Sequence, residues 1–87
     1  MNTLVVSTFS CSFYSFKKDV TELFLEDMRK EFVTAYEFMK VNEHKSHLLM
    51  YVTDLEKLGD AMANPVATEW DKKNNCHDTV YKIEHVE

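Results

Sequence analysis

The order in which strand-like and helical segments alternate constrains this fold more than any other feature of the sequence. β-Branched or alternating apolar residues predict strands, whereas apolar residues at helical spacing after a capping residue predict helices. The expected elements are a strand at Thr3–Ser10, a helix capped by Ser12 and running to about Glu31, strands at Val33–Val41 and Ser46–Thr53, a helix capped by Asp54, interrupted at Asn64-Pro65 and continuing to about Lys73, and a strand at Asp78–Val86.

This order corresponds to two strand–helix–strand units joined by a hairpin, which predicts a ferredoxin-like α+β fold of order βαββαβ. Right-handed crossovers would place both helices on one face of a four-stranded antiparallel sheet, with the strands in the spatial order 4-1-3-2. Eighty-seven residues are enough for one domain only, so residues 1–87 are expected to form it. Val66 and Trp70 lie four positions apart, and we expect both to face the core.

The hairpin connection predicts which side chains share each face of the sheet. If Asn42–Lys45 forms a four-residue connection, Val41 lies opposite Ser46, and successive side chains alternate between the faces. Glu37 then faces the helices, where it is either a buried general base or, as we prefer for an edge strand, a solvated residue. The helix-facing set is Ala35, Met39, Leu48, Met50 and Val52, and the opposite set is Tyr36, Phe38, His47, Leu49 and Tyr51.

The face turned away from the helices is expected to be too apolar for a monomer. A lone sheet of this kind leaves that face in water, where polar side chains would be normal. The hairpin instead offers Tyr36, Phe38, Leu49 and Tyr51, and the first strand is apolar on both sides. We therefore expect two copies to pair, sheet against sheet, as a homodimeric α+β barrel.

Charge and cysteine content limit the partners and the location. The net charge is −5 and the basic residues are scattered, so neither a nucleic acid nor an anionic membrane surface is an expected partner. No apolar run approaches the roughly 20 residues that cross a bilayer. Two cysteines are too few for a disulfide scaffold, which favours a cytoplasmic location.

At the level of fold, the chain resembles the dimeric α+β barrel group, specifically small domains related to antibiotic-biosynthesis monooxygenases. The resemblance rests on Ser12-Phe13 to Phe16 at the start of the first helix, on Thr53–Lys57, on Asn64-Pro65 and on the closing strand. It implies a ferredoxin-like fold and a homodimer. It assigns no catalytic residue, because folds of this group carry several unrelated activities.

Aromatic and polar residues of the strands are the candidates for a ligand site. Aromatic walls with a few polar tips suit a small hydrophobic ligand, although tyrosines are equally typical of a dimer interface, which we favour. The candidate ligand-binding residues are Tyr36, Phe38, His47, Tyr51 and Tyr81.

Cys11, Cys76 and His77 form a second candidate group, because an antiparallel pairing of the first and last strands brings them together. A metal site is not expected, since a fourth ligand is missing and the spacing matches no zinc motif. We expect instead two reduced thiols that lie close together in space. No cofactor is expected, because the chain has one glycine and no phosphate-binding loop.

Two functions remain open from the sequence. One is a non-catalytic homodimeric module that binds a small ligand or a partner protein, which we prefer. The alternative is a cofactor-independent enzyme, monooxygenase-like or isomerase-like, acting on a small aromatic or conjugated substrate. The enzyme needs a polar group in a ligand-sized cavity, with Tyr36, His47, Tyr51 and Tyr81 as the available residues.

Overall fold

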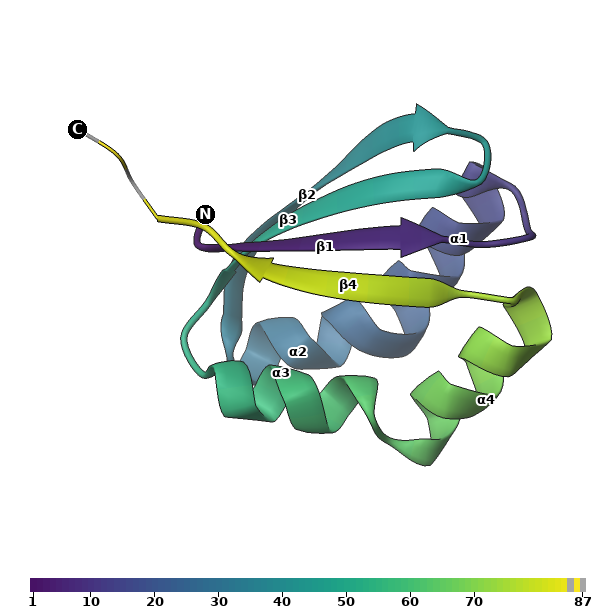
Figure 1. Ribbon diagram of the computed structural model, residues 1–87. Helices are drawn as coiled ribbons and strands as arrows, with labels where there is room; N and C mark the ends of the chain where they lie inside the picture. The colour runs from purple at the N-terminus through teal and green to yellow at the C-terminus, as the bar shows by residue number, and fades with distance from the viewer. Residues whose placement is uncertain (85, 87) are drawn as a thin grey trace.

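The computed structural model describes residues 1–84 and 86 and shows a four-stranded sheet with helices on one side (Figure 1). In chain order the elements are β1 (Thr3–Thr8), α1 (Phe13–Val20), the π-helical η1 (Thr21–Leu25), α2 (Glu26–Glu31), β2 (Val33–Asn42), β3 (Lys45–Val52), α3 (Leu55–Met62), α4 (Pro65–Asn74) and β4 (His77–Lys82). No helix among the described residues is long and apolar enough to cross a membrane.

The sheet has the predicted strand order. Its strands are arranged β2-β3-β1-β4 and every neighbouring pair is antiparallel. Both crossovers are helical, as predicted, but neither is a single helix. The first contains α1, η1 and α2, and the second contains α3 and α4. The last strand is shorter than expected: β4 ends at Lys82, and position 85 of the predicted strand lies outside the described residues.

Both predicted helix caps, Ser12 and Asp54, are present, and Asn64 at the predicted interruption is a third. The Ser12 side chain accepts a hydrogen bond from the Ser15 amide, Asp54 accepts one from Lys57, and Asn64 accepts one from Ala67. Each bond satisfies an amide that the first helical turn leaves without a partner. The π-helical turn η1 was not predicted, because apolar spacing cannot distinguish an i→i+5 turn from an α-helix.

The predicted hairpin register is wrong by one residue over most of its length. Asn42 pairs with Lys45 as the predicted register requires, but the next pair is Lys40 with Ser46, so a β-bulge at Val41 shifts the strand. A one-residue shift exchanges the two faces of a strand. Tyr36 and Phe38 consequently lie opposite Met50 and Leu48 on the helix-facing side.

The shift also moves Glu37 and Met39 to the face that the helices leave uncovered. Both are exposed, so the prediction that Glu37 faces the helices is wrong, whereas its solvated character is confirmed. The connection between β2 and β3 is shorter than predicted, since only Glu43 and His44 lie outside the strands.

Two adjoining apolar clusters lie between the sheet and the helices. The larger contains Val5, Leu25, Met28, Phe32, Val33, Leu48, Met50, Val52 and Leu58; the smaller contains Phe9, Phe16, Trp70 and Cys76. Phe38 packs against both, with its ring edge-on to Phe16 at 6.2 Å between centroids. The core therefore includes an aromatic residue that the sequence had placed on the opposite face.

The single tryptophan is buried, as predicted. Trp70 is 8% exposed, and its indole Nε1 donates a hydrogen bond of 3.1 Å to Asp19 Oδ2 on α1. The prediction for Val66 is wrong, because it is 58% exposed and Ala67 faces the core instead. Helix α4 is thus attached to α1 through Trp70.

The other face of the sheet has no helix over it (Figure 1). Cross-strand pairing places Leu4 beside Leu49 and Tyr81, and Val6 beside His47. Tyr51, Tyr81 and Met39 are exposed, while the central residues are partly buried by their neighbours. We call this surface the outer sheet face and define it by residues of all four strands: Leu4, Val6, Glu37, Met39, His47, Leu49, Tyr51 and Tyr81.

Candidate functional site

The structure divides the five predicted ligand-binding residues between the two faces of the sheet. Tyr36 and Phe38 face the helices and pack against the core, with their rings edge-on at 6.0 Å. His47, Tyr51 and Tyr81 lie on the outer sheet face. The five residues therefore do not form one site, and the cause is the β-bulge at Val41.

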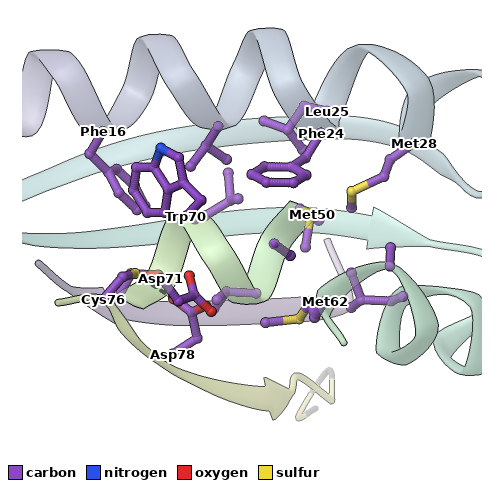
Figure 2. Close-up of a pocket in the computed structure, with 17 residues that line it drawn as sticks. Phe16, Phe24, Leu25, Met28, Met50, Met62, Trp70, Asp71, Cys76 and Asp78 are labelled. Carbon is purple, nitrogen blue, oxygen red and sulfur yellow. Dashed lines mark hydrogen bonds between the residues drawn. The ribbon is translucent and has the colours of Figure 1, made fainter. Parts of the chain in front are cut away.

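A cavity of about 80 Å³ lies between the helices and the sheet (Figure 2). Its walls are mostly apolar and come from every layer of the domain: Val5, Phe16, Val20, Phe24, Leu25, Met28, Leu48, Met50, Leu58, Ala61, Met62, Ala67 and Trp70, with Ser7, Asp71, Cys76 and Asp78 as the polar members. Among the described residues that line it, none is one of the five predicted from the sequence.

The π-helical turn contributes directly to this cavity. Phe24 and Leu25 belong to η1, and Val20 immediately precedes it. A π turn adds a residue to the helical repeat and is frequent at functional sites because it redirects side chains. The turn therefore forms part of the cavity wall, opposite Met50 of β3 (Figure 2).

The polar members form one cluster at one end of the cavity, which we call the acidic end and define by Ser7, Asp71, Cys76 and Asp78. Asp78 Oδ1 accepts hydrogen bonds from Ser7 Oγ at 2.5 Å and from Cys76 Sγ at 3.4 Å. One ligand atom of each of Asp71, Cys76 and Asp78 lies within 4.8 Å of the others. Asp78 is exposed, so this end of the cavity is in contact with solvent.

Burial and mutual repulsion shift the pKa values at the acidic end. Burial, followed by repulsion from Asp78, raises the pKa of the Asp71 carboxyl above its ordinary value of 3.8. Burial also raises the pKa of the Cys76 thiol strongly, and the carboxylates of Asp78 and Asp71 raise it further. Cys76 is therefore a neutral thiol at physiological pH, which makes it a poor nucleophile.

Three residues of the acidic end have metal-ligand chemistry. Asp71, Cys76 and Asp78 could supply three donor atoms, and a bound metal would have to displace the proton of the Cys76 thiol. The predicted partner His77 is exposed and is not part of the cluster. The described cluster therefore offers three donor atoms, one fewer than the four ligands of a structural zinc site.

The strand pairing behind the cysteine prediction is confirmed. The first and last strands pair antiparallel, with Thr8 opposite His77. Both cysteines are free, and Cys11 packs against the cluster that contains Cys76. Burial is the main cause that raises the pKa of the Cys11 thiol as well.

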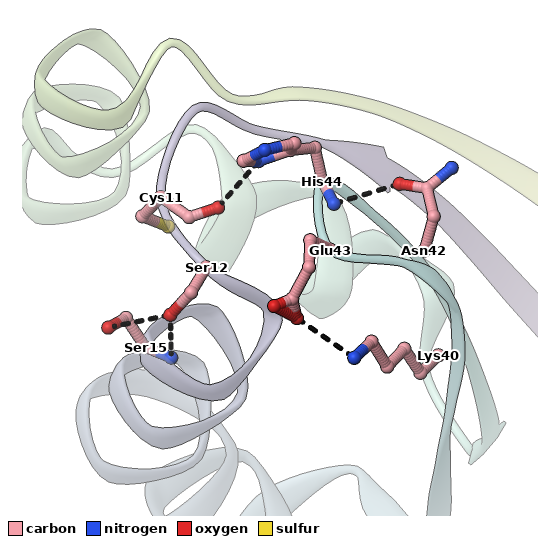
Figure 3. A network of polar contacts seen from close by, with 7 residues as sticks. All are labelled: Cys11, Ser12, Ser15, Lys40, Asn42, Glu43 and His44. Atoms are coloured by element: carbon pink, nitrogen blue, oxygen red, sulfur yellow. Dashed lines mark hydrogen bonds and ion pairs between the residues drawn. The ribbon is translucent and has the colours of Figure 1, made fainter.

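A second polar network lies at the tip of the hairpin (Figure 3). His44 Nδ1 lies 3.0 Å from the Cys11 carbonyl oxygen, the His44 amide donates to Asn42 Oδ1, and Lys40 forms an ion pair with Glu43 at 2.9 Å. Each side chain is at the surface, so water competes for these contacts. The network fixes the hairpin against the segment before α1 and does not enclose a space for a ligand.

Replacing Asp71 with asparagine should stabilise the domain at pH 7. The folded state raises the pKa of this carboxyl. At every pH above that raised pKa, the charged carboxylate therefore lowers the free energy of unfolding, and the neutral amide does not. The advantage of the variant should shrink as the pH falls through the folded pKa and vanish below about 3.8. Urea unfolding at pH 7 and at pH 3 measures the difference in stability, with Asp60→Asn, on the exposed side of α3, as the control. An equal advantage at both pH values would contradict the assigned cause.

Comparison with known proteins gives no assignment. No protein-family model, no curated protein and no solved structure matches the chain. The site therefore has to be interpreted from its own geometry.

Proposed function

We propose that this chain is a non-catalytic homodimeric domain of ferredoxin-like type that binds a small ligand in the cavity between its helices and its sheet. The cavity is the observation that carries the proposal. Protein interiors are close-packed and hold few spaces larger than one water molecule, which needs roughly 10–15 Å³. A space of about 80 Å³ in so small a domain supports a role in ligand binding.

The stability cost of an empty cavity supports this interpretation. The apolar atoms that line the space lack the contacts that a close-packed core would give them, and a bound ligand would supply those contacts. Larger side chains at Ala61 or Ala67 would fill the space, so the small residues there favour a binding role.

The composition of the cavity wall favours binding over catalysis. The residues considered for the alternative enzyme do not line the cavity: Tyr36, His47, Tyr51 and Tyr81. The remaining titratable groups are Asp71, Cys76 and Asp78, and the thiol is held in its unreactive form. The alternative enzyme would have to use Asp71, whose pKa burial raises, as its general base.

The homodimer is proposed from the outer sheet face. Leu4, Leu49 and Tyr81 are cross-strand neighbours there, with Val6, Tyr51 and Met39 around them. Burying about 600 Å² on each copy would contribute about 15 kcal/mol before the cost of association. The total of about 1,200 Å² reaches the lower limit of stable protein–protein interfaces. A second copy offers the same apolar face, so one symmetric contact covers both.

Methionine-methyl NMR under xenon pressure tests the cavity. Met28, Met50 and Met62 line it, whereas Met1 and Met39 do not, so the five methyl groups contain their own control. Xenon enters empty apolar cavities in proteins. We expect saturable shifts of the three cavity methyl signals and small, linear shifts of the other two.

A matched pair of variants checks the location. Ala61→Leu fills the cavity and should abolish the saturable shifts, whereas Ala63→Leu, exposed at the end of α3, should leave them unchanged. If all five methyl signals of the unmodified protein respond alike, the cavity is closed or filled and the proposed function is wrong.

A further inference from the structure

The cavity is apolar at one end and acidic at the other. Met28 and Met62 lie toward one end, and Asp71, Cys76 and Asp78 lie together below Trp70 in the view of Figure 2. No described lining residue is a lysine, an arginine or a histidine. With a net charge of −5 for the whole chain, an anionic ligand would be repelled at this site.

The acidic end has more hydrogen-bond acceptors than donors. Its two donors are the Ser7 hydroxyl and the Cys76 thiol, and both donate to Asp78 Oδ1. No described residue donates to Asp78 Oδ2. The partly buried Asp71 carboxylate can receive at most a share of the single thiol proton. A ligand group with several N–H donors would satisfy these oxygens.

The volume limits the apolar part of the ligand. About 80 Å³ is roughly half of the 150 Å³ that holds a benzene molecule. The apolar body should therefore contain about three carbon atoms, with some tolerance because methionine side chains adapt their shape. An aromatic ring does not fit without rearrangement.

We propose that the ligand is a small primary aliphatic amine, bound as its ammonium ion. This inference rests on the proposed function. The alkyl chain occupies the space between η1 and β3, next to Leu25 and Met50. The ammonium group lies at the acidic end and donates hydrogen bonds to the carboxylates of Asp71 and Asp78. Three donors on a compact cation match the open acceptors there.

Three probes of equal length separate charge from shape. n-Propylammonium, 1-propanol and propanoate are titrated into the unmodified protein at pH 7, and the methyl signals of Met28, Met50 and Met62 report occupancy. Charge-assisted hydrogen bonds are about twice as strong as neutral ones. We expect n-propylammonium to bind at least ten-fold more tightly than 1-propanol, and propanoate not to bind.

Substitution at the acidic end tests the contact. Asp71→Asn should reduce the n-propylammonium affinity several-fold, because only the Asp78 carboxylate remains to accept from the ammonium group, while the affinity for 1-propanol should change less. The control Asp60→Asn, on the exposed side of α3, should leave the affinity of all three probes unchanged.

Each other outcome overturns a defined part of the account. Equal affinities for n-propylammonium and 1-propanol would show that the cavity binds apolar ligands, as the proposed function states, but that the amine assignment is wrong. Shifts confined to backbone signals around Asp78, without a response of the cavity methyl groups, would indicate surface ion pairing only. If no probe affects the three methionine signals, the inference and the proposed function both fail.

Discussion

Replacing Trp70 with alanine should lower the free energy of unfolding by about 3–5 kcal/mol. Trp70 is buried against Phe16 at 5.9 Å between ring centroids, and its indole nitrogen is bonded to Asp19 across the helical layer. Truncation removes both contacts and detaches α4 from α1. Urea unfolding followed by far-ultraviolet circular dichroism measures the loss.

A matched variant separates packing from the hydrogen bond. Trp70→Phe keeps an aromatic ring but cannot donate to Asp19, so it should lose less than half as much stability as the alanine variant. In the unmodified protein the tryptophan emission maximum should be that of a buried indole. A cost of less than 1 kcal/mol for Trp70→Ala would show that α4 is not held in this way.

Replacing Leu25 with alanine should cost about 3–5 kcal/mol and create a benzene site. Leu25 is 1% exposed, belongs to both the core and the cavity wall, and lies in the π-helical turn. Truncation should enlarge the cavity toward the roughly 150 Å³ that binds benzene. Benzene should therefore raise the thermal midpoint of the variant but not of the unmodified protein, because a ligand that binds only the folded state stabilises it.

The control for this substitution lies two residues away in the same turn. Leu23 is 47% exposed, so Leu23→Ala should change stability by less than about 0.5 kcal/mol and should not respond to benzene. A benzene effect of equal size in both variants would mean that benzene acts on the surface and not in the cavity.

Local signals in the sequence predicted much of the fold. Ser12 and Asp54 cap helices as expected, because a capping side chain acts on amides within three residues of itself. The strand order followed from the handedness of the crossovers. The face assignment of β2 failed, because one extra residue at Val41 reverses it and nothing in the apolar pattern marks a β-bulge.

The cavity could not have been predicted in the same way. Its wall combines residues of both crossovers with β1 and β3, and a gap between them depends on side-chain packing rather than on a pattern along the chain. One local signal was available: Cys76 and Asp78, two positions apart at the start of a strand, point to the same face. The contribution of Asp71 needed the left-handed turn at Asn75 that ends α4.

Sedimentation equilibrium of the unmodified protein tests the proposed pairing through the outer sheet face most directly. At tens of micromolar, the account predicts a mass twice the 10.3 kDa of the chain. Leu49→Asp should give a folded monomer, because the carboxylate would be buried in the interface without a partner. Asp60→Asn, on the exposed side of α3 and away from this face, should remain dimeric. A mass of 10.3 kDa for the unmodified protein at this concentration would contradict the homodimer and with it the proposed function in its present form.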